Sequence, residues 1–297
     1  MAEDKGAGAK AFRLANALLL SLLAVAAFYP IFYVLVASVS DPVKLYAASK
    51  VLLFPQGFSL AAYKIVFTNS WIWRSYLNTL FYVVAGGALS IFVTLLGGYA
   101  LSRKYLPGRS VFLVIVTITM FFSGGLIPTF IIVNGLGLTD TVFAMILPSA
   151  VSTYNLLVMK TFLQGLPDEM EETSRIDGAN DFTILWKVMA PLAAPALAVV
   201  SLFYIVSIWN SYIAPTIYLR NRDLFPLQVI LREILLSGNT NSTNLNLSVS
   251  GGNEDYQAYS DAVKYATIVV ATVPILCVYP FLQRYFVKGV MLGAIKG

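Results

Sequence analysis

Long apolar stretches alternate with short polar ones along the chain. Each apolar stretch has about twenty residues or more, the length that an α-helix needs to cross a bilayer. No Asp, Glu, Lys or Arg lies well inside any of them. The pattern therefore predicts an all-α polytopic membrane protein with six transmembrane helices, near residues 14–38, 76–102, 111–133, 141–163, 188–216 and 263–283.

The outermost polar stretches define the rest of the predicted organisation. We expect an N-terminal tail at 1–13, a six-helix membrane domain at 14–287 and a C-terminal tail at 288–297. The first apolar stretch resembles a signal peptide around Ala24-Val25-Ala26, but it continues through Ala37. That run is longer than a signal h-region, so we interpret it as a retained helix.

The longest polar connection, residues 217–262, is expected on the outer side of the membrane. Its middle is rich in Asn, Ser, Thr and Gly, and such a segment does not form a core of its own. Residues 225–231 are apolar enough to predict a short helix at the outer surface. Connections of this length are either functional or disordered, so a docking loop and a flexible connector both stay open.

Paired glycines mark the second and third apolar stretches, at Gly86-Gly87, Gly97-Gly98 and Gly124-Gly125. Small residues let membrane helices approach closely, and glycine permits bends where neighbours satisfy the backbone. The pairs therefore indicate either tight helix packing or a moving helix along a translocation path.

Composition and charge support a membrane protein and give it an orientation. The chain is 58% hydrophobic and 12% charged, with a mean hydropathy of +0.75, whereas soluble domains carry about a quarter charged residues. Twelve of the twenty Lys and Arg residues fall on the side that holds both termini, which places that side in the cytoplasm. This bias also explains the net charge of +5, which therefore does not indicate nucleic acid.

Several chemistries are excluded by missing residue types. With no histidine and only Cys277, the chain cannot form an internal disulfide, a Cys/His metal site or a histidine-based triad. The Walker A pattern is absent, so we predict no cofactor in this chain and no ATP site of that kind. An ion-coupled secondary transporter usually keeps ionisable residues at mid-membrane, and a membrane-embedded enzyme needs a paired acid and base there. The apolar stretches hold neither, so both alternatives rank behind an ATP-driven transporter.

The stretch 165–192 is a charged, helix-patterned segment between two apolar ones, and it holds six of the fifteen acidic residues. Pro167 predicts the start of a short helix, and Gly178 predicts its end. Arg175 lies at helical spacing from both Glu171 and Glu172, which predicts an exposed ion pair worth a few tenths of a kcal/mol. A second amphipathic turn is predicted from the spacing of Phe182, Leu185, Trp186 and Met189.

This segment resembles the EAA loop of permease subunits of bacterial ABC importers. The resemblance rests on Glu172-Thr173-Ser174, Asp177-Gly178-Ala179 and Pro191-Leu192. The R-I-D-G-A variant around Asp177 is similar to that of carbohydrate-uptake permeases, such as the second maltose-importer permease and the oligosaccharide (lpl-type) permeases. Thr173 and Ser174 replace the two alanines of the family pattern, and they are still small.

Four further segments resemble the same family in order along the chain. They lie at Asn78–Leu80 with Tyr99–Arg103, at Thr139–Pro148, at Trp209–Pro215 and at Gln283–Gly297. The resemblance therefore runs from about residue 12 to the end of the chain.

The resemblance implies a type I ABC importer permease fold in the bacterial cytoplasmic membrane. Its expected partners are a related second permease, two ABC ATPase subunits that bind ATP and Mg²⁺, and an extracytoplasmic solute-binding protein. It also implies that the acidic segment is an ATPase-coupling loop, with contact or turn roles for Glu172, Thr173, Ser174, Asp177, Gly178 and Ala179.

The transported solute is expected to be a sugar, with an oligosaccharide favoured by the resemblance and a non-sugar solute as the alternative. Sugars bind polar side chains and aromatic faces, and the apolar stretches offer a few of each. These candidate path residues can equally hydrogen-bond one helix to another. They are Tyr154, Asn155, Tyr204, Asn210 and Tyr212.

Overall fold

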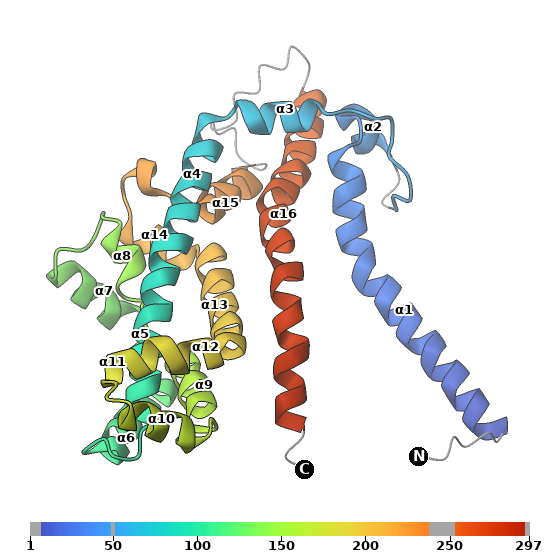
Figure 1. Ribbon diagram of the computed structural model, residues 1–297. Helices are drawn as coiled ribbons and strands as arrows, with labels where there is room; N and C mark the ends of the chain where they lie inside the picture. Colours follow the sequence, from blue (N-terminus) through green and yellow to red (C-terminus); the bar gives the residue numbers. More distant parts are fainter. Residues whose placement is uncertain (1–6, 49–50, 238–252, 295–297) are drawn as a thin grey trace. The chain divides into compact units, whose positions relative to one another are not determined.

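The computed structural model describes residues 7–48, 51–237 and 253–294. These residues form helices and one isolated antiparallel bridge between Ser40 and Phe58, which confirms the all-α class. Figure 1 shows the elements in chain order. The helices of the first half are α1 (Ala7–Ser38), α2 (Pro42–Ala47), α3 (Ala61–Thr68), α4 (Ser70–Phe81), the π-helix η1 (Tyr82–Gly86), α5 (Gly87–Ser102), α6 (Arg109–Phe121), α7 (Leu126–Gly135) and α8 (Phe143–Ile146).

The second half contains several short helical segments and the longest helix, α16. They are α9 (Thr153–Gln164), α10 (Asp168–Ile176), α11 (Asp181–Ile184), the π-helix η2 (Leu185–Met189), α12 (Ala190–Leu192), α13 (Ala194–Trp209), α14 (Ile213–Tyr218), the 3-10 helix η3 (Arg222–Leu224), α15 (Leu227–Ser237) and α16 (Asn253–Ala294).

Three of the predicted membrane spans lie in long, apolar helices. These helices cover Gly8–Ser38, Ser70–Ser102 and Gln257–Cys277. Their outward surfaces carry many large apolar side chains, such as Phe28 and Val84, as contact with lipid tails requires. Asn69 separates α3 from the second of these helices, which begins at Ser70, six residues before the predicted start at 76.

The other three predicted spans are not continuous helices. Helices α6 and α7 meet at an angle of 116°, and the helical segments Asp181–Leu192 and Ala194–Trp209 meet at 83°. In the first pair Gly125 has a φ of 84°, a left-handed conformation that suits glycine. The predicted span 141–163 divides into α8 and α9, with Pro148 in the non-helical segment between them. The count of six spans stays a prediction, since the structure has three to five candidate spans among its described residues.

The chain forms two compact units, residues 1–70 with 233–272, and residues 71–232 with 273–297. The first unit has a small core around Val36, Ala37 and Leu52. In it, the ring of Tyr33 meets the ring of Tyr265 edge-on, with centroids 5.8 Å apart. All candidate site residues belong to the second unit, whose core positions them.

The core of the second unit lies where α5 packs against α9, α13 and the 181–189 segment. It contains Leu95, Met159, Leu163, Ile184 and Val200, all almost fully buried. A Cβ at Gly98 would lie only 2.8 Å from Met159 Cγ, and one at Gly97 would lie 3.0 Å from Leu156 Cδ1. These two glycines therefore allow α5 and α9 to approach closely, which agrees with the tight-packing interpretation.

The predicted short helix at 225–231 is present as α15, but it is more than a surface element. Leu227, Val229, Ile230 and Ile234 are buried, so its apolar side is packed. The Asn- and Ser-rich middle of the predicted outer loop, residues 238–252, lies outside the described residues.

Candidate functional site: an acidic loop helix and its buried anchor

The acidic segment folds into helix α10, which ends where the sequence predicts. Gly178 has a φ of 78°, and its N–H donates to the carbonyl oxygen of Arg175 at 3.0 Å. The N–H of Ala179 donates to the carbonyl oxygen of Ser174, also at 3.0 Å. This pair of bonds is the Schellman arrangement, which satisfies the last carbonyls of the helix and favours glycine. Pro167 does not enter the helix as predicted, because it is the N-terminal capping residue with extended backbone, φ −58° and ψ 131°.

Most of the surface of α10 is open to solvent. Ile176 is 85% exposed, Met170 is 47% exposed, and Glu172, Thr173 and Asp177 are also exposed. Ser174 is half-buried and donates its hydroxyl to the carbonyl oxygen of Met170 at 2.8 Å. An exposed isoleucine beside acidic and small polar residues makes a mixed surface, which suits contact with another protein.

One side chain of α10 points the other way. Glu171 is buried, and its Oε2 accepts from Nη1 of Arg103, the residue that caps the end of α5. Arg103 also donates from Nη2 to the carbonyl oxygen of Leu163 at 3.0 Å and from Nε to Ser102 Oγ at 2.9 Å. The two charged side chains are 7% and 9% exposed. This contact therefore connects α10 to the ends of both α5 and α9.

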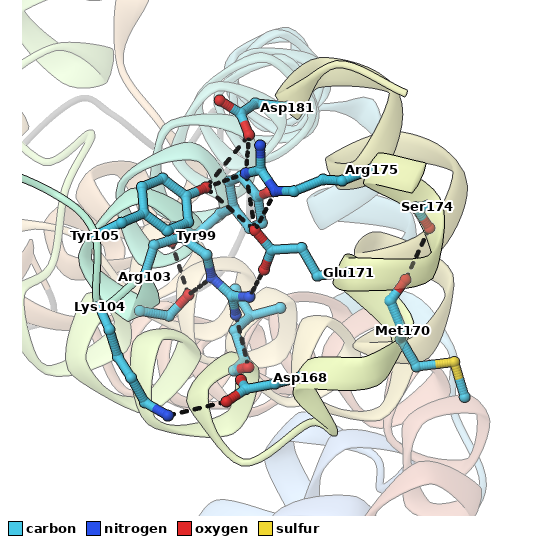
Figure 2. A network of polar contacts seen from close by, with 12 residues as sticks. Tyr99, Arg103, Lys104, Tyr105, Asp168, Met170, Glu171, Ser174, Arg175 and Asp181 are labelled. Atoms are coloured by element: carbon cyan, nitrogen blue, oxygen red, sulfur yellow. Dashed lines mark hydrogen bonds and ion pairs between the residues drawn. The ribbon is translucent and has the colours of Figure 1, made fainter. Parts of the chain in front are cut away.

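A second arginine, Arg175, contacts the same carboxylate from the solvent-facing side. Arg175 donates from Nη2 to Glu171 Oε1 at 2.9 Å and to Asp181 Oδ1 at 2.5 Å. The same nitrogen donates to the hydroxyl of Tyr105 at 2.6 Å, and the guanidinium lies over the Tyr105 ring, 4.9 Å from its centroid. Figure 2 shows Glu171 between the two arginines, with Asp181 beyond Arg175.

Hydrogen bonds and burial shift the pKa values in this network in the directions that keep each group in its usual protonation state. The hydrogen bond to Glu171, followed by that to Asp181, raises the pKa of Arg175. Burial raises the pKa of Tyr105, and the carboxylates of Glu171 and Asp181 raise it further, so its hydroxyl stays protonated. At the edge of the network, Lys104 Nζ donates to Asp168 Oδ2 at 2.9 Å, which lowers the pKa of that carboxyl. This outer pair is exposed and contributes little to stability.

The structure corrects the predicted role of Arg175. It does not form an exposed pair that competes for Glu172, because its partner Glu171 is buried. Within the described residues Glu172 has no ion pair, so its carboxylate is open to a partner. Sequence reasoning missed Arg103, which lies 68 positions before Glu171. The only signal was its place at the end of an apolar stretch, and such a place does not identify a partner.

The second amphipathic turn is also different from the prediction. Leu185 and Met189 are buried, as expected, but Phe182 is 67% exposed and Trp186 is 45% exposed. These residues lie in α11 and η2, and the π-helical turn changes the spacing, so the four side chains do not share one face. The exposed Phe182 extends the apolar part of the loop surface.

The five candidate path residues lie in different environments. Tyr204 is buried, and its hydroxyl bonds with Thr94 Oγ1 at 2.7 Å and with the N–H of Ser152 at 2.9 Å. This arrangement matches the helix-to-helix interpretation. Asn155 is also buried, and Asn210 donates its side-chain amide to the carbonyl oxygen of Val206 at 2.9 Å.

The remaining two candidates are exposed tyrosines. Tyr154 is 53% exposed and Tyr212 is 41% exposed. The guanidinium of Arg232 lies over the ring of Tyr212, 5.2 Å from its centroid. This contact was not predicted from the sequence. In the described part of the chain, no group of three or more His, Cys, Asp or Glu side chains could hold a metal ion.

The fold and this loop define a class of protein: an integral membrane subunit with a polar, exposed loop helix anchored on its helical core. The chain belongs to the family described as the inner membrane component of binding-protein-dependent transport systems, whose model matches residues 86–292. It is therefore a permease subunit of a bacterial ABC importer with the type I permease fold.

Relatives and a solved structure agree with this assignment. The chain is 41% identical over 278 residues to the polygalacturonan/rhamnogalacturonan transport system permease protein YtcP of Bacillus subtilis strain 168, covering 94% of this chain and 96% of that one. It is 37% identical over 290 residues to protein LplC of the same strain, covering 97% and 96%. A crystal structure of a bacterial ABC transporter involved in the import of the acidic polysaccharide alginate contains a chain with 34% identity and a TM-score of 0.86, covering 96% of this chain and all of that chain.

Proposed function

We propose that this chain forms, with a related second permease, the translocation path for an oligosaccharide. An extracytoplasmic solute-binding protein delivers the sugar, and two ATPase subunits bind ATP and Mg²⁺ and drive the cycle. The chain itself supplies no ATP site and works in the bacterial cytoplasmic membrane, with both termini in the cytoplasm.

The names of the similar proteins support the proposed substrate class. The name of YtcP specifies polygalacturonan and rhamnogalacturonan, and the similar solved structure belongs to an importer of the acidic polysaccharide alginate. Other relatives are named for arabinooligosaccharides and alpha-glucosides. A carbohydrate is common to these names, and a sugar acid is common to the first two.

The observation that carries the coupling role is the two-sided character of α10. Its inner side is fixed by the buried contact between Glu171 and Arg103, which joins it to α5 and α9. Its outer side presents Ile176 and the unpaired carboxylate of Glu172 to solvent. A helix held in this way moves as one piece with α5, so a partner that pushes the exposed side displaces the membrane helices.

The orientation follows from the positive residues. Lys104, just after α5, donates to Asp168 of α10, and Arg109, at the start of α6, donates to Gln164 at the end of α9. Positively charged connections favour the cytoplasmic side, where the ATPase subunits bind ATP.

The test is the substitution Glu172→Ala in the complete complex reconstituted in liposomes. We expect hydrolysis stimulated by the sugar-loaded binding protein to fall about tenfold, because a hydrogen bond to a charged group contributes about 1.5–3 kcal/mol. The matched control is Glu169→Ala, which removes an exposed carboxylate from the first turn of the same helix.

The thermal stability of the membrane domain should not change in either variant, since both side chains are exposed. Normal assembly, transport and stimulated hydrolysis in Glu172→Ala would count against the assigned role of α10.

A further inference from the structure

Arg232 and Tyr212 form an exposed pair on the second unit. Arg232 lies on α15, and Tyr212 lies in the short break between α13 and α14. Both side chains are exposed, and the guanidinium stacks over the ring at 5.2 Å from its centroid. Stacking of this kind fixes the plane of an arginine side chain.

Among the described residues the nitrogen donors of Arg232 have no hydrogen-bond partner, unlike those of the arginines at the coupling loop. Arg103 and Arg175 donate to Glu171, and Arg109 donates to the carbonyl oxygen of Leu101 at 2.8 Å. Across the residues that the structure describes, the Arg232 side chain makes the ring contact and no hydrogen bond or ion pair. A stacked guanidinium keeps five N–H donors in a rigid fork, which fits a carboxylate.

The surroundings favour an anion. Between Ile213 and Arg232 the chain carries three arginines, Arg220, Arg222 and Arg232, and one carboxylate, Asp223. The half-buried Arg222 also stacks on a ring, with its guanidinium over Trp71 at 4.8 Å from the centroid. The end of α13 next to this segment lies away from α10 and α11 (Figure 1). The pair is therefore separate from the coupling loop.

Tyr212 lies in a break between two helices of one apolar segment. Helix α13 ends at Trp209 and α14 begins at Ile213, so residues 210–212 interrupt an apolar segment. Interrupted helices in transporters are tolerated where they line a cavity or a substrate path. An exposed arginine next to such a break is costly in a membrane protein unless it meets water or an anion.

We propose that Arg232 binds the carboxylate of a sugar acid unit of the transported oligosaccharide, and that Tyr212 is a positioning residue that holds the guanidinium. The inference rests on the proposed function and narrows its substrate to acidic oligosaccharides.

The experiment measures equilibrium binding to the purified permease–ATPase complex in detergent, without the binding protein. The two probes are trigalacturonate and its methyl ester, which share the sugar skeleton and differ in charge. We expect the wild-type complex to bind trigalacturonate about tenfold or more tightly, since one charge-assisted bond is worth that factor. Arg232→Gln should remove this preference and leave the affinity for the ester unchanged.

Three further variants test the binding role of Arg232 and the positioning role of Tyr212. Arg220→Gln removes another exposed arginine of the same segment, one with no ring contact among the described residues, so it should reduce the preference less than Arg232→Gln does. Tyr212→Phe should keep it because the ring remains, whereas Tyr212→Leu should reduce it about two- to fivefold, the range expected from loss of an exposed cation–π contact.

The proposal is overturned if the wild-type complex shows no preference for the acid. It is also overturned if Arg232→Gln lowers the affinity for both probes by the same factor. Those results leave the importer assignment intact if a loaded binding protein still stimulates hydrolysis. If the chain does not assemble with any ATPase subunit, the proposed function itself is wrong.

Discussion

At the residue scale, the two neighbouring glutamates of α10 have opposite environments. Glu171 is buried between Arg103 and Arg175, and Glu172 is exposed. Taking charges out of water is costly, and the cost is offset only while each charge keeps its partner. Glu171 therefore holds the loop in place, which leaves Glu172 available for contact with another subunit.

Removal of one charge from the buried pair should release α10. In Glu171→Gln the guanidinium of Arg103 loses its ionic partner, a change that costs about 3–5 kcal/mol in buried pairs. We expect faster hydrogen exchange of the α10 amides and a loss of stimulated ATP hydrolysis. Replacing both partners, with Arg103→Met and Glu171→Met, should restore part of the exchange protection, because no buried charge is then left alone.

Equal exchange rates in Glu171→Gln and the wild type would show that the buried pair does not anchor α10. Glu169→Gln is the control, since that carboxylate is exposed on the same helix.

The sequence was informative about this site only where the signal is local. Gly178 could be predicted as a helix end because the left-handed turn depends on one residue and its immediate neighbours. The pairing of Arg103 with Glu171 depends on how α5 and α9 pack, and no periodicity in the sequence contains that information. For the same reason, helical spacing alone could not tell which of the two glutamates is buried.

At the element scale, α5 organises the second unit. It packs against α9 and α13, and its last residues lead into the loop that holds Arg103, Lys104 and Tyr105. Gly97 and Gly98 allow this packing. The position of α10 therefore depends on this interface, in which Gly98 lies five residues before Arg103.

A larger residue in this interface should disturb the membrane domain. In Gly98→Ala the new methyl group would lie 2.8 Å from Met159 Cγ and 3.3 Å from the backbone nitrogen of Lys160. Overpacking of this kind costs about 1–3 kcal/mol, so we expect a lower thermal midpoint of the purified complex. Gly87→Ala is the matched control on the same helix, because its Cβ would meet open space.

An unchanged midpoint in Gly98→Ala, or an equal decrease in both variants, would contradict close packing of α5 on α9. Gly87→Ala should be neutral or slightly stabilising, since alanine favours the helix by up to about 1 kcal/mol.

The apolar stretches predicted where helices occur, but not where they break. Continuous helices were expected at 111–133 and 188–216, whereas the first is bent by 116° at Gly125 and the second region is bent by 83° near Ala193. Hydropathy averages over a window and does not register a turn of a few apolar residues. Glycine and proline give a local signal for such a bend: Gly125 and Pro128 lie at the first one, and prolines lie on both sides of Ala193 at the second.

At the scale of the whole molecule, the two ends of the second unit have different chemistry. One end presents the acidic, exposed α10, and the other presents arginines stacked on Trp71 and Tyr212. In an importer permease the first end suits a cytoplasmic ATPase and the second suits an anionic solute on its way inward. The chain between them consists of apolar helices with interrupted segments, a feature that many transporters use at their substrate sites.

The central claim is that α10 contacts an ATPase subunit, and site-specific cross-linking tests it most directly. Cys277 is the only cysteine, so Cys277→Ser gives a background without thiols in this chain. Ile176→Cys then places one thiol at a residue that is 85% exposed on α10, and Phe58→Cys places a control thiol at a residue that is 75% exposed in the first unit.

With a short reagent that couples the thiol at one end and a photoreactive group at the other, we predict a cross-link from position 176 to the ATPase subunit in the assembled complex. Its yield should change when ATP is added, and position 58 should give no such product. A complex with normal activity in which position 176 forms no cross-link to the ATPase, or in which position 58 forms one instead, would contradict the account.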